Sequence, residues 1–565
     1  MTSNTPLTYQ LAKWTCAIEI VPLARTHSAT DKQISDRLQR DLHYKDCAAY
    51  ISADRVFSAL NSPSFARSPH KCILNEMADS KSSAQVGLTP AGFPVIDSTP
   101  PTELEIQQEI AFNDWFRMEV EKDHSSEVRI AQDAQRNRVL EFVQDSVQTT
   151  VKSLFKAQFP DDPLPPLHEL AVVLPYGSFR IDVHDAHSDM DIVAVVPEWV
   201  RREALFEGFR SCLSSCADCS CVQVLLSARA PVLKFVMFSF SVDVAVAILI
   251  YDRVPNPFSP QALIENVVDE KSALALVGPS NSDALLELVP DPERFRQLLR
   301  FIKLWAKNNF IYSNAFGFLG GMAWSLLCAF ICQIYPRATV PALVARFFKV
   351  MKGWNWMATE VCVSPPQPIS KWGGWSRHNG RDRALVHIIT PVAPLQNSAF
   401  NVSQSALGIM TKRMWDAGKC FPFESFAGDN GSRQMLGCFS RALAKQNFFA
   451  TYQRFIIFEV CSPSQDDHIG WRGLVESQLR KLISLVQDTV EQVQFLHPYP
   501  CAIDPPENES LMPNCFPPVP TASTPTDTAI ASSPSASTPG SSDESVKLLS
   551  SKVRYRTWFA IGIRC

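Results

Sequence analysis

The sequence has little glycine and little net charge. Only 21 of its 565 residues are glycine, fewer than its 41 prolines, and this ratio excludes a collagen-like repeat. Hydrophobic residues make up 46% of the chain and charged residues 19%, which excludes wholesale disorder and predicts a globular protein of two to four domains. The formal net charge is −4, so the whole chain is not coated in basic residues, although a local basic surface stays open.

Targeting and membrane segments are also lacking. No apolar run of signal-peptide length follows a basic N-terminus, and the 16 cysteines are scattered, so we expect a reduced, intracellular setting. The longest uncharged stretch covers residues 308–336. Its first part is polar and turn-like, and its apolar part, residues 316–335, suits a helix buried inside a domain. We therefore predict no membrane span.

Three common motifs of nucleotide-binding proteins and hydrolases are absent: GxxxxGK[ST], GxGxxG and GxSxG. Their absence removes the P-loop ATPases, the dinucleotide-binding enzymes and the serine hydrolases. Four cysteines do cluster, but without the second ligand set of a zinc finger or ribbon, so a metal site there is disfavoured. They are Cys212, Cys216, Cys219 and Cys221.

The hydrophobic pattern predicts an α+β multidomain protein. Residues 1–86 show no strong periodicity and are predicted as an N-terminal extension, whose order the pattern leaves open. Residues 102–155 have apolar residues at three- and four-residue spacing, which is typical of two amphipathic helices. A sheet interleaved with helices should follow, because short β-branched or aromatic runs alternate with turn residues. Its expected strands cover residues 170–174, 191–196, 231–240 and 242–251.

A long helix is expected from Asp291, an N-cap residue followed by proline in the first turn. One face of this helix is apolar, and the other carries a basic stripe that would ordinarily be solvated: Arg296, Arg300, Lys303 and Lys307. Further on we predict helices over residues 404–414 and 470–493, and strands over residues 384–389, 455–461 and 554–563. Because a strand follows it, the Ser/Thr/Pro-rich segment is predicted to be a disordered insertion inside the last domain.

Residues with clear chemistry gather at the start of one predicted strand. A turn with Gly177 and Ser178 is soon followed by Asp189 and Asp191. Side chains two residues apart on a strand share a face, so these carboxylates repel each other unless a cation lies between them. Mg²⁺ is typically held by a few carboxylates plus substrate phosphates. Asp243, inside a run too apolar to bury it unpartnered, would supply a third carboxylate.

A Gly-Ser turn, an Asp-x-Asp pair and a hydrophobic strand in this order resemble the signature of the nucleotidyltransferase superfamily shared with DNA polymerase β. The glycine lets the backbone approach a phosphate, and the N–H groups and hydroxyl can cradle it. Four other stretches resemble eukaryotic nuclear poly(A) polymerases, in unchanged order over roughly residues 87–565. They are DALLELVP (283–290), IKLWAKNNFIYSNAFGFLGGMAW (302–324), HIITPVAPLQNSAFNVS (387–403) and WRGLVESQLRKL (471–482).

The resemblance implies a function and a set of site residues. It implies template-independent transfer of AMP from ATP to RNA 3′ ends, with two ions of Mg²⁺ or Mn²⁺ at Asp189, Asp191 and Asp243 and with release of pyrophosphate. The same resemblance implies a nucleotide-binding set. Its members are Tyr176, Gly177, Ser178, Lys234, Lys303, Tyr312, Asn314, Gly320, Gly321 and Met322, with Lys303 and Tyr312 closing on the phosphates.

The resemblance also implies a domain layout. A polymerase β-like nucleotidyltransferase domain is expected at 156–270, a helical central domain at 271–415, and a ferredoxin-like, RRM-type RNA-binding domain at 416–565. The helices of 87–155 are expected to pack with the central domain, and the disordered insertion to cover about 510–548. The family further implies a nuclear location, cleavage and polyadenylation factors as partners, and a monomeric enzyme.

One departure and two alternatives stay open. Where the family commonly has Leu-Asn-Gly, this chain has Leu276, Val277 and Gly278, so a polar contact to the nucleotide is expected to be missing. The function could instead be that of a terminal uridylyl- or CCA-adding transferase, or of an inactive RNA-binding scaffold. Residues 294–481 hold 23 Lys and Arg against 9 Asp and Glu, a balance of +14 that leaves −18 for the rest. This local excess of positive charge suits an RNA backbone.

Overall fold

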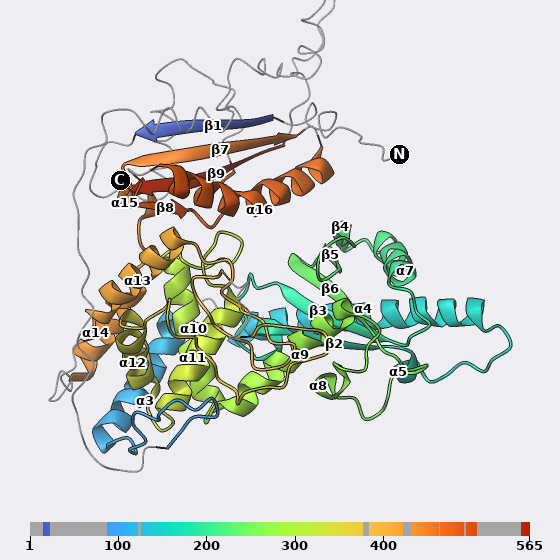
Figure 1. Cartoon of the computed structure of the whole chain (residues 1–565), viewed down its shortest axis with the longest axis horizontal. Coiled ribbons are helices and arrows are strands. Elements are labelled where there is room, and N and C mark those ends of the chain that lie inside the picture. Colours follow the sequence, from blue (N-terminus) through green and yellow to red (C-terminus); the bar gives the residue numbers. More distant parts are fainter. Residues whose placement is uncertain are drawn as a thin grey trace, which may run out of the picture.

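The computed structural model describes residues 15–22, 87–121, 126–376, 383–421, 431–462, 464–490, 493–504 and 555–564. They form a five-stranded sheet with its own helices, a group of central helices, and a four-stranded sheet beyond them (Figure 1). The predicted insertion at about 510–548 lies outside the described residues.

The five-stranded sheet has the order β2-β3-β6-β5-β4. Its strands are β2 (Val172–Tyr176), β3 (Met190–Val196), β4 (Cys219–Leu225), β5 (Val232–Met237) and β6 (Phe240–Ile248). Only β3 and β6 pair in parallel, and their register places Asp191 beside Asp243. After Asp191 and Asp243, both strands continue as apolar runs because helices cover both faces of the sheet.

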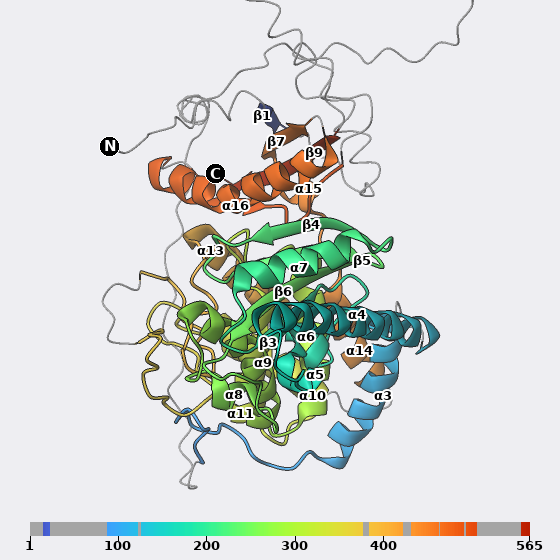
Figure 2. The same ribbon diagram turned by 90° about the vertical axis from the view of Figure 1, so that its right-hand side faces the viewer.

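Alternate side chains of β3 enter two different cores. Ile192 and Ala194 pack with α4 (Ser126–Gln158) and α7 (Arg202–Ser214), which lie in front of the sheet in Figure 2. Val193 and Val195 pack on the opposite face, with α9 (Glu270–Leu288). The expectation that α4 packs with the central domain is therefore wrong, because its valines fill the core under this sheet. Three short helices join these elements: α5 (Leu167–Leu170), α6 (Gly177–Arg180) and α8 (Pro260–Leu263).

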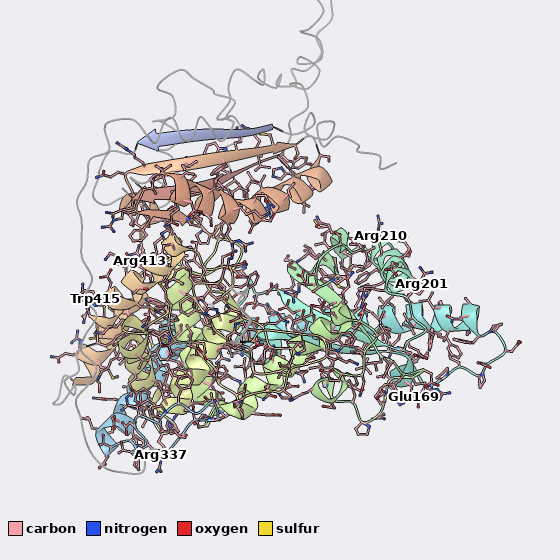
Figure 3. The ribbon with its side chains drawn as sticks, viewed as in Figure 1. Glu169, Arg201, Arg210, Arg337, Arg413 and Trp415 are labelled. Atoms are coloured by element: carbon pink, nitrogen blue, oxygen red, sulfur yellow. The ribbon has the colours of Figure 1, made fainter. Side chains whose placement is uncertain are left out.

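The central helices share one core, in which α11 is almost entirely buried. They are α3 (Glu103–Glu119), α10 (Pro292–Asn308), α11 (Gly321–Ile334), α12 (Val340–Lys352), α13 (Gln404–Gly418) and α14 (Gly431–Leu443). The uncharged stretch is thus a core helix, and no helix in the described part of the chain has the length and apolarity to cross a membrane. Arg337, just after α11, lies at the end of the molecule farthest from the four-stranded sheet (Figures 1 and 3).

The four-stranded sheet is antiparallel, with the order β1-β7-β9-β8. Its strands are β1 (Thr15–Pro22), β7 (Arg454–Ser462), β8 (Phe495–Pro498) and β9 (Tyr555–Arg564), and α15 (Phe448–Thr451) and α16 (Gln465–Thr489) pack against it. β1 lies in the N-terminal extension, whose order the sequence pattern leaves open, and it pairs with β7 along its whole length.

Residues 384–389 do not form the predicted strand. They make only isolated bridges, Ile388 with Val361 and Ile389 with Asn397. The side chain of Asn397 replaces a strand partner: its Oδ1 accepts from the N–H of Ile388, and its Nδ2 donates to the carbonyl of Val386. A local side-chain contact thus satisfies backbone that has strand-like composition.

Candidate active site

The three predicted carboxylates lie together on the α9 side of the sheet. Asp191 and Asp243 are direct neighbours across β3 and β6, and Asp189 precedes Asp191 by two residues. Burial, together with the charges of Asp189 and Asp243, raises the pKa of Asp191 to about 7. Period-two alternation therefore identified a real cluster of like charge.

The donor set suits a hard divalent cation. Lys234, opposite Asp243 on β5, makes an ion pair with its Oδ2, whereas Oδ1 of Asp243 is buried without a hydrogen-bond partner. Among the described residues, His, Cys, Asp and Glu side chains form no finished metal cage. The orphaned oxygen and the raised pKa of Asp191 nevertheless show negative charge that the protein leaves uncompensated, and oxygen donors of this kind fit Mg²⁺ or Mn²⁺.

Gly177 is required where it meets Asp191. Its φ is +66°, and a Cβ there would lie 2.6 Å from Oδ2 of Asp191. Its N–H donates to Oγ of Ser282 on α9 at 3.0 Å, and Arg180 of the same short helix, α6, makes an ion pair with Asp283 at 2.5 Å. The Gly177–Ser178 turn therefore lies against the carboxylates, as predicted, and α9 fixes it from behind.

Tyr176 and Val277 lie next to this turn. The ring of Tyr176 packs so closely on α9 that a Cβ at Gly278 would come within 2.7 Å of it. Burial, and then the charges of the three carboxylates, raises the pKa of the Tyr176 phenol. Val277 is only 3% exposed and belongs to the core between α9 and the sheet, so it offers no polar group to a nucleotide.

The second group of predicted nucleotide contacts lies on the turn between α10 and α11. A Cβ at Gly321 would lie 3.0 Å from Oη of Tyr312, and one at Gly320 would lie 3.2 Å from Cβ of Asn314, so both glycines make room for these side chains. Burial raises the pKa of Tyr312, and the charges of Asp189, Asp185 and Asp191 add to the effect. This turn is therefore close enough to the carboxylates for their charges to affect the pKa of Tyr312. Met322 packs against the central core.

Lys303 has a different partner from the phosphates that the resemblance implies. It is only 7% exposed, and its Nζ donates to the carbonyl of Val183 at 2.9 Å. Burial lowers its pKa to about 8, with Lys307 adding to the effect and Asp185 opposing it. The side chain therefore lies against the turn that leads to Asp189.

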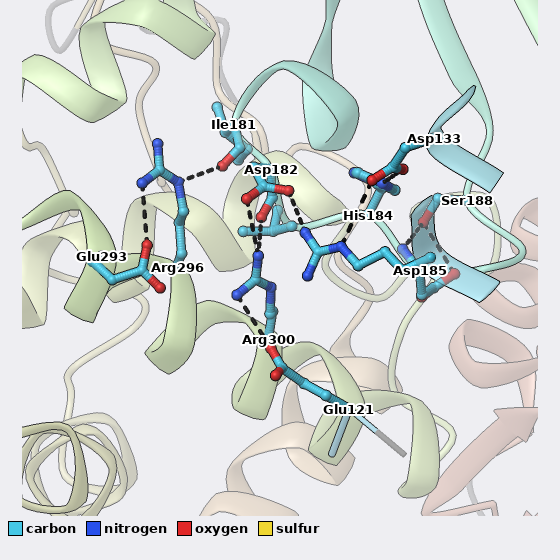
Figure 4. Close-up of polar contacts among 12 residues, drawn as sticks. Glu121, Asp133, Ile181, Asp182, His184, Asp185, Ser188, Glu293, Arg296 and Arg300 are labelled. Atoms are coloured by element: carbon cyan, nitrogen blue, oxygen red, sulfur yellow. Dashed lines mark hydrogen bonds and ion pairs between the residues drawn. The ribbon is translucent and has the colours of Figure 1, made fainter. Parts of the chain in front are cut away.

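The rest of the basic stripe holds the same turn, residues 181–188. Figure 4 shows Arg296 and Arg300 against Ile181 and Asp182. The stripe is therefore not a solvated face, and the prediction from its pattern is wrong. Each of its four members bonds a successive part of the turn. Arg296 donates to the carbonyl of Ile181 at 3.0 Å, Arg300 to that of Asp182 at 2.5 Å and Lys303 to that of Val183, while Lys307 makes an ion pair with Asp185. We call these four side chains the α10 ladder.

Helix α4 holds the turn from the other side. Arg129 makes an ion pair with Asp182 at 2.5 Å, and Asp133 accepts from Nε2 of His184 at 2.8 Å. Arg136, fully buried, donates to the carbonyls of Asp185 and Ser188. Sequence patterns missed these contacts because they join residues about 50 and 120 positions apart. In the sequence, the only indication of these contacts is that the basic stripe and the two aspartates of the turn, Asp182 and Asp185, carry opposite charges.

The cysteine cluster is not a metal site in the described structure. Burial, together with Cys216, raises the pKa of the Cys219 thiol on β4 to about 12, so the thiol is protonated at neutral pH. No group of metal-ligating side chains forms here among the described residues.

Three sequence families match successive parts of the chain. The poly(A) polymerase nucleotidyltransferase domain matches residues 94–289, the poly(A) polymerase central domain 294–423, and the poly(A) polymerase predicted RNA binding domain 447–511. The fold class predicted from the sequence is confirmed by these matches. The first match begins before α4 and ends after α9, the two helices that cover the faces of the five-stranded sheet.

Curated relatives carry the same family name. Nuclear poly(A) polymerase 2 of Arabidopsis thaliana is 35% identical over 343 residues, which are 58% of this chain and 41% of that protein. Poly(A) polymerase of Dictyostelium discoideum is 33% identical over 59% of this chain and 40% of that protein, so this chain spans about two fifths of both relatives. Poly(A) polymerase pla1 of Schizosaccharomyces pombe is 30% identical over 74% of this chain and 70% of that protein. The chain belongs to the poly(A) polymerase family.

Proposed function

We propose that this chain is a template-independent polynucleotide adenylyltransferase, which transfers AMP from ATP to the 3′ end of RNA and releases pyrophosphate. The observation that carries the proposal is the register of β3 and β6, which sets Asp191 beside Asp243, with the charge of Asp189 close enough to raise the pKa of Asp191. Family membership supports the same reaction. The site is bordered by the helical, basic part of the chain at residues 294–481. Its positive charge suits the phosphates of both an adenylyl donor and an RNA acceptor.

Each wall of the site has a distinct role in this proposal. Asp189, Asp191 and Asp243 would hold two ions of Mg²⁺ or Mn²⁺, which when bound supply charge neutralisation for the attacking and leaving oxygens. Gly177 and Ser178 bind and orient the triphosphate. Lys303, Tyr312 and Asn314 would contact the same nucleotide from the central helices, together with Gly320, Gly321 and Met322, while Tyr176 and Lys234 border it from the sheet.

Lys234 and Lys303 already use their positive charges in contacts within the protein. In the described structure, Lys234 neutralises one oxygen of Asp243, and Lys303 bonds the carbonyl of Val183. We propose that Lys303 turns from this carbonyl to the triphosphate when ATP binds. A phosphate oxygen is a better acceptor for an ammonium group than a neutral carbonyl is.

A primer-extension experiment tests the function. Incubating the protein with a labelled oligo(A) primer, Mg²⁺ or Mn²⁺ and each nucleoside triphosphate separately should give extension with ATP above all others. Asp243→Ala should reduce extension at least a hundredfold, and Arg337→Ala, at the far end of the molecule, should leave it unchanged. Preference for UTP, or an ordered CCA addition, would show that the substrate assignment is wrong. Equal extension by wild type and Asp243→Ala would overturn the catalytic assignment, and no extension by the wild type would favour a scaffold.

The proposed setting follows from the relatives. Because curated relatives are named nuclear poly(A) polymerases, we propose a nuclear location, with cleavage and polyadenylation factors as recruiting partners and a monomer as the active unit. Imaging a fluorescent fusion of the chain tests the location, and size-exclusion chromatography with light scattering tests the monomer.

A further inference from the structure

A cavity of about 540 Å³ opens between the loop before α13 and helix α16. Phe400 and Asn401 line it from the loop, and Arg480, Lys481 and Asp488 line it from the helix. The catalytic cluster uses none of these side chains. A cavity of this size is large enough for one nucleotide-sized group.

Arg480 lies in this cavity without an anionic partner. Its side chain is partly buried, burial lowers its pKa, and it has neither an ion pair nor a hydrogen bond with any described residue. Its stem lies over Gly317: a Cβ there would be 3.6 Å from Cγ of Arg480, and φ is +84° at this glycine. A guanidinium that is partly desolvated and unpaired favours an anion with two oxygens that can accept its parallel N–H groups, such as a phosphate.

The neighbouring residues narrow the chemistry of the ligand. Lys481 is exposed and adds a second positive charge, while Phe400 presents an aromatic ring that is 61% exposed. Asp488 is the one acidic residue among those lining the cavity, and it lies two helical turns further along α16, about 10 Å by helix rise. Cations that pair with phosphate beside an aromatic ring that can stack a base are typical of sites for single-stranded nucleic acid.

The cavity adjoins the proposed nucleotide site. Nδ2 of Asn401 donates to Oδ1 of Asn314 at 3.2 Å and lies 3.4 Å from the Asn314 carbonyl. Gly317, under the Arg480 stem, belongs to the same turn as Asn314 and Tyr312. One wall of the cavity is therefore bonded directly to the turn that would hold ATP.

We propose that this cavity binds one nucleotide of the single-stranded RNA primer, upstream of the 3′ end, with its base stacked on Phe400 and its phosphate paired with Arg480 and Lys481. The proposal rests on the adenylyltransferase function above and adds to it the residues that hold the acceptor strand. It places the RNA between α16 and the loop before α13, so that the strand leads toward the turn of Tyr312 and Asn314.

Binding of fluorescein-labelled oligo(A) to the full chain, measured by anisotropy without ATP, tests the cavity separately from catalysis. Arg480→Met keeps the stem over Gly317 and removes the charge, so it should weaken binding about tenfold and lower the salt slope by about 0.7. Phe400→Ala should weaken binding five- to a hundredfold, and Phe400→Trp should restore it. Arg337→Ala, which removes a distant exposed charge, is the matched control and should bind as the wild type does.

Lys481→Gln is the second variant, because Lys481 is exposed and its loss leaves packing intact. In primer extension, Arg480→Met and Lys481→Gln should raise the KM for oligo(A) severalfold and leave the KM for ATP unchanged. Affinities of both variants and of Phe400→Ala within twofold of wild type would overturn the proposal. A raised KM for ATP instead would also overturn it, because the cavity would then belong to the nucleotide site.

The outcomes separate this proposal from the proposed function. If the wild type extends oligo(A) with ATP but the cavity variants bind normally, the cavity proposal fails alone. If binding depends on Arg480 and Phe400 but no nucleotide is added, the function fails alone. If the wild type does not bind oligo(A), the cavity proposal fails, and primer extension still decides the function.

Discussion

The central helices meet the two sheets through different kinds of contact. Toward the four-stranded sheet the contact is apolar: one continuous core holds residues of α10 to α13 together with residues of α16, β7, β8 and β9. Toward the five-stranded sheet, the α10 ladder bonds the turn at 181–188, and only Ile181 and Val183 of that turn enter the central core. Helix α9 runs between the two, with Ala284 on the sheet side and Leu285 on the central side.

The two kinds of contact should differ in how easily they separate, and this difference predicts which parts of the protein move. Separating an apolar core exposes surface at a cost of about 25 cal/mol per Å², whereas the ladder's hydrogen bonds and ion pair exchange for contacts with water, so that each is worth about 1–3 kcal/mol or less. We therefore expect the central helices and the four-stranded sheet to behave as one body, and the five-stranded sheet to shift against them. Such a shift would bring the carboxylates and the Tyr312 turn together around a nucleotide.

The largest effect is expected from breaking the apolar contact. Leu496 on β8 is 1% exposed and belongs to the shared core. Leu496→Ala should lower the free energy of unfolding by about 2–5 kcal/mol, because it leaves a cavity between sheet and helices. Urea unfolding measures this loss, and Leu474→Ala, at a residue that is 51% exposed on α16, is the control that should change little. Separate unfolding transitions for the central helices and this sheet would contradict the single body.

Low pH should weaken the same contact. His497 is fully buried; its Nε2 donates to the carbonyl of Phe310, just after α10, and its Nδ1 accepts from the hydroxyl of Tyr452. Burial lowers its pKa to about 3 from the ordinary 6.5, so the unfolded chain binds a proton between these values and the folded chain does not. Stability is therefore complete above pH 6.5 and should fall by about 1.4 kcal/mol for each pH unit below it.

The variant His497→Gln is the control for this pH dependence. Glutamine keeps a donor and an acceptor but does not titrate, so its unfolding free energy should lose this part of the slope between pH 6.5 and about 4. An identical slope in wild type and His497→Gln, both measured by urea unfolding, would place the pH dependence elsewhere.

The ladder should show a smaller coupling. Lys307 and Asp185 pair with side chains that are 39% and 35% exposed. A double-mutant cycle with Lys307→Met and Asp185→Asn should give a coupling energy of about 1 kcal/mol or less, which 0.5 M NaCl should reduce further. A coupling above about 3 kcal/mol that ignores salt would show that this contact is as rigid as the apolar one.

The smallest effect is expected for an ion pair that belongs to neither contact. Lys412 and Asp416 are four residues apart on α13, with side chains 54% and 37% exposed. Lys412→Ala should cost about 0.3–0.5 kcal/mol. Thermal unfolding of this variant measures the energy of an exposed ion pair, with which the ladder can be compared. If the coupling energy of Lys307 and Asp185 is no larger, the position of that pair in the ladder adds nothing to its strength.

Sequence reasoning succeeded where a short-range period carries the information. Alternation predicted that Asp189 and Asp191 lie close together, and the charge of Asp189 does raise the pKa of Asp191. The N-cap Asp291 accepts from the N–H groups of Glu293 and Arg294, as expected. Hydrophobic continuity identified α11 as a core helix. In each case the physical cause acts within a few residues, so the pattern is visible in the chain itself.

It failed where distant segments decide the outcome. A basic stripe looks the same whether water or the turn at 181–188 faces it, so the ladder could not be predicted. The amphipathic pattern of α4 shows that it buries a face but not which core receives it. The partner of Lys303 was also missed, because a backbone carbonyl leaves no mark in the sequence.

The four-stranded sheet joins strands that are far apart in the chain, because β1 pairs with β7. Strand β7 begins more than 430 residues after β1, and β9, on the other side of β7, follows it in the chain. During synthesis β1 must therefore stay unpaired until β7 has been made. A shortened chain that starts at residue 87 would keep every residue of the candidate active site and still expose one edge of β7, an open template for aggregation.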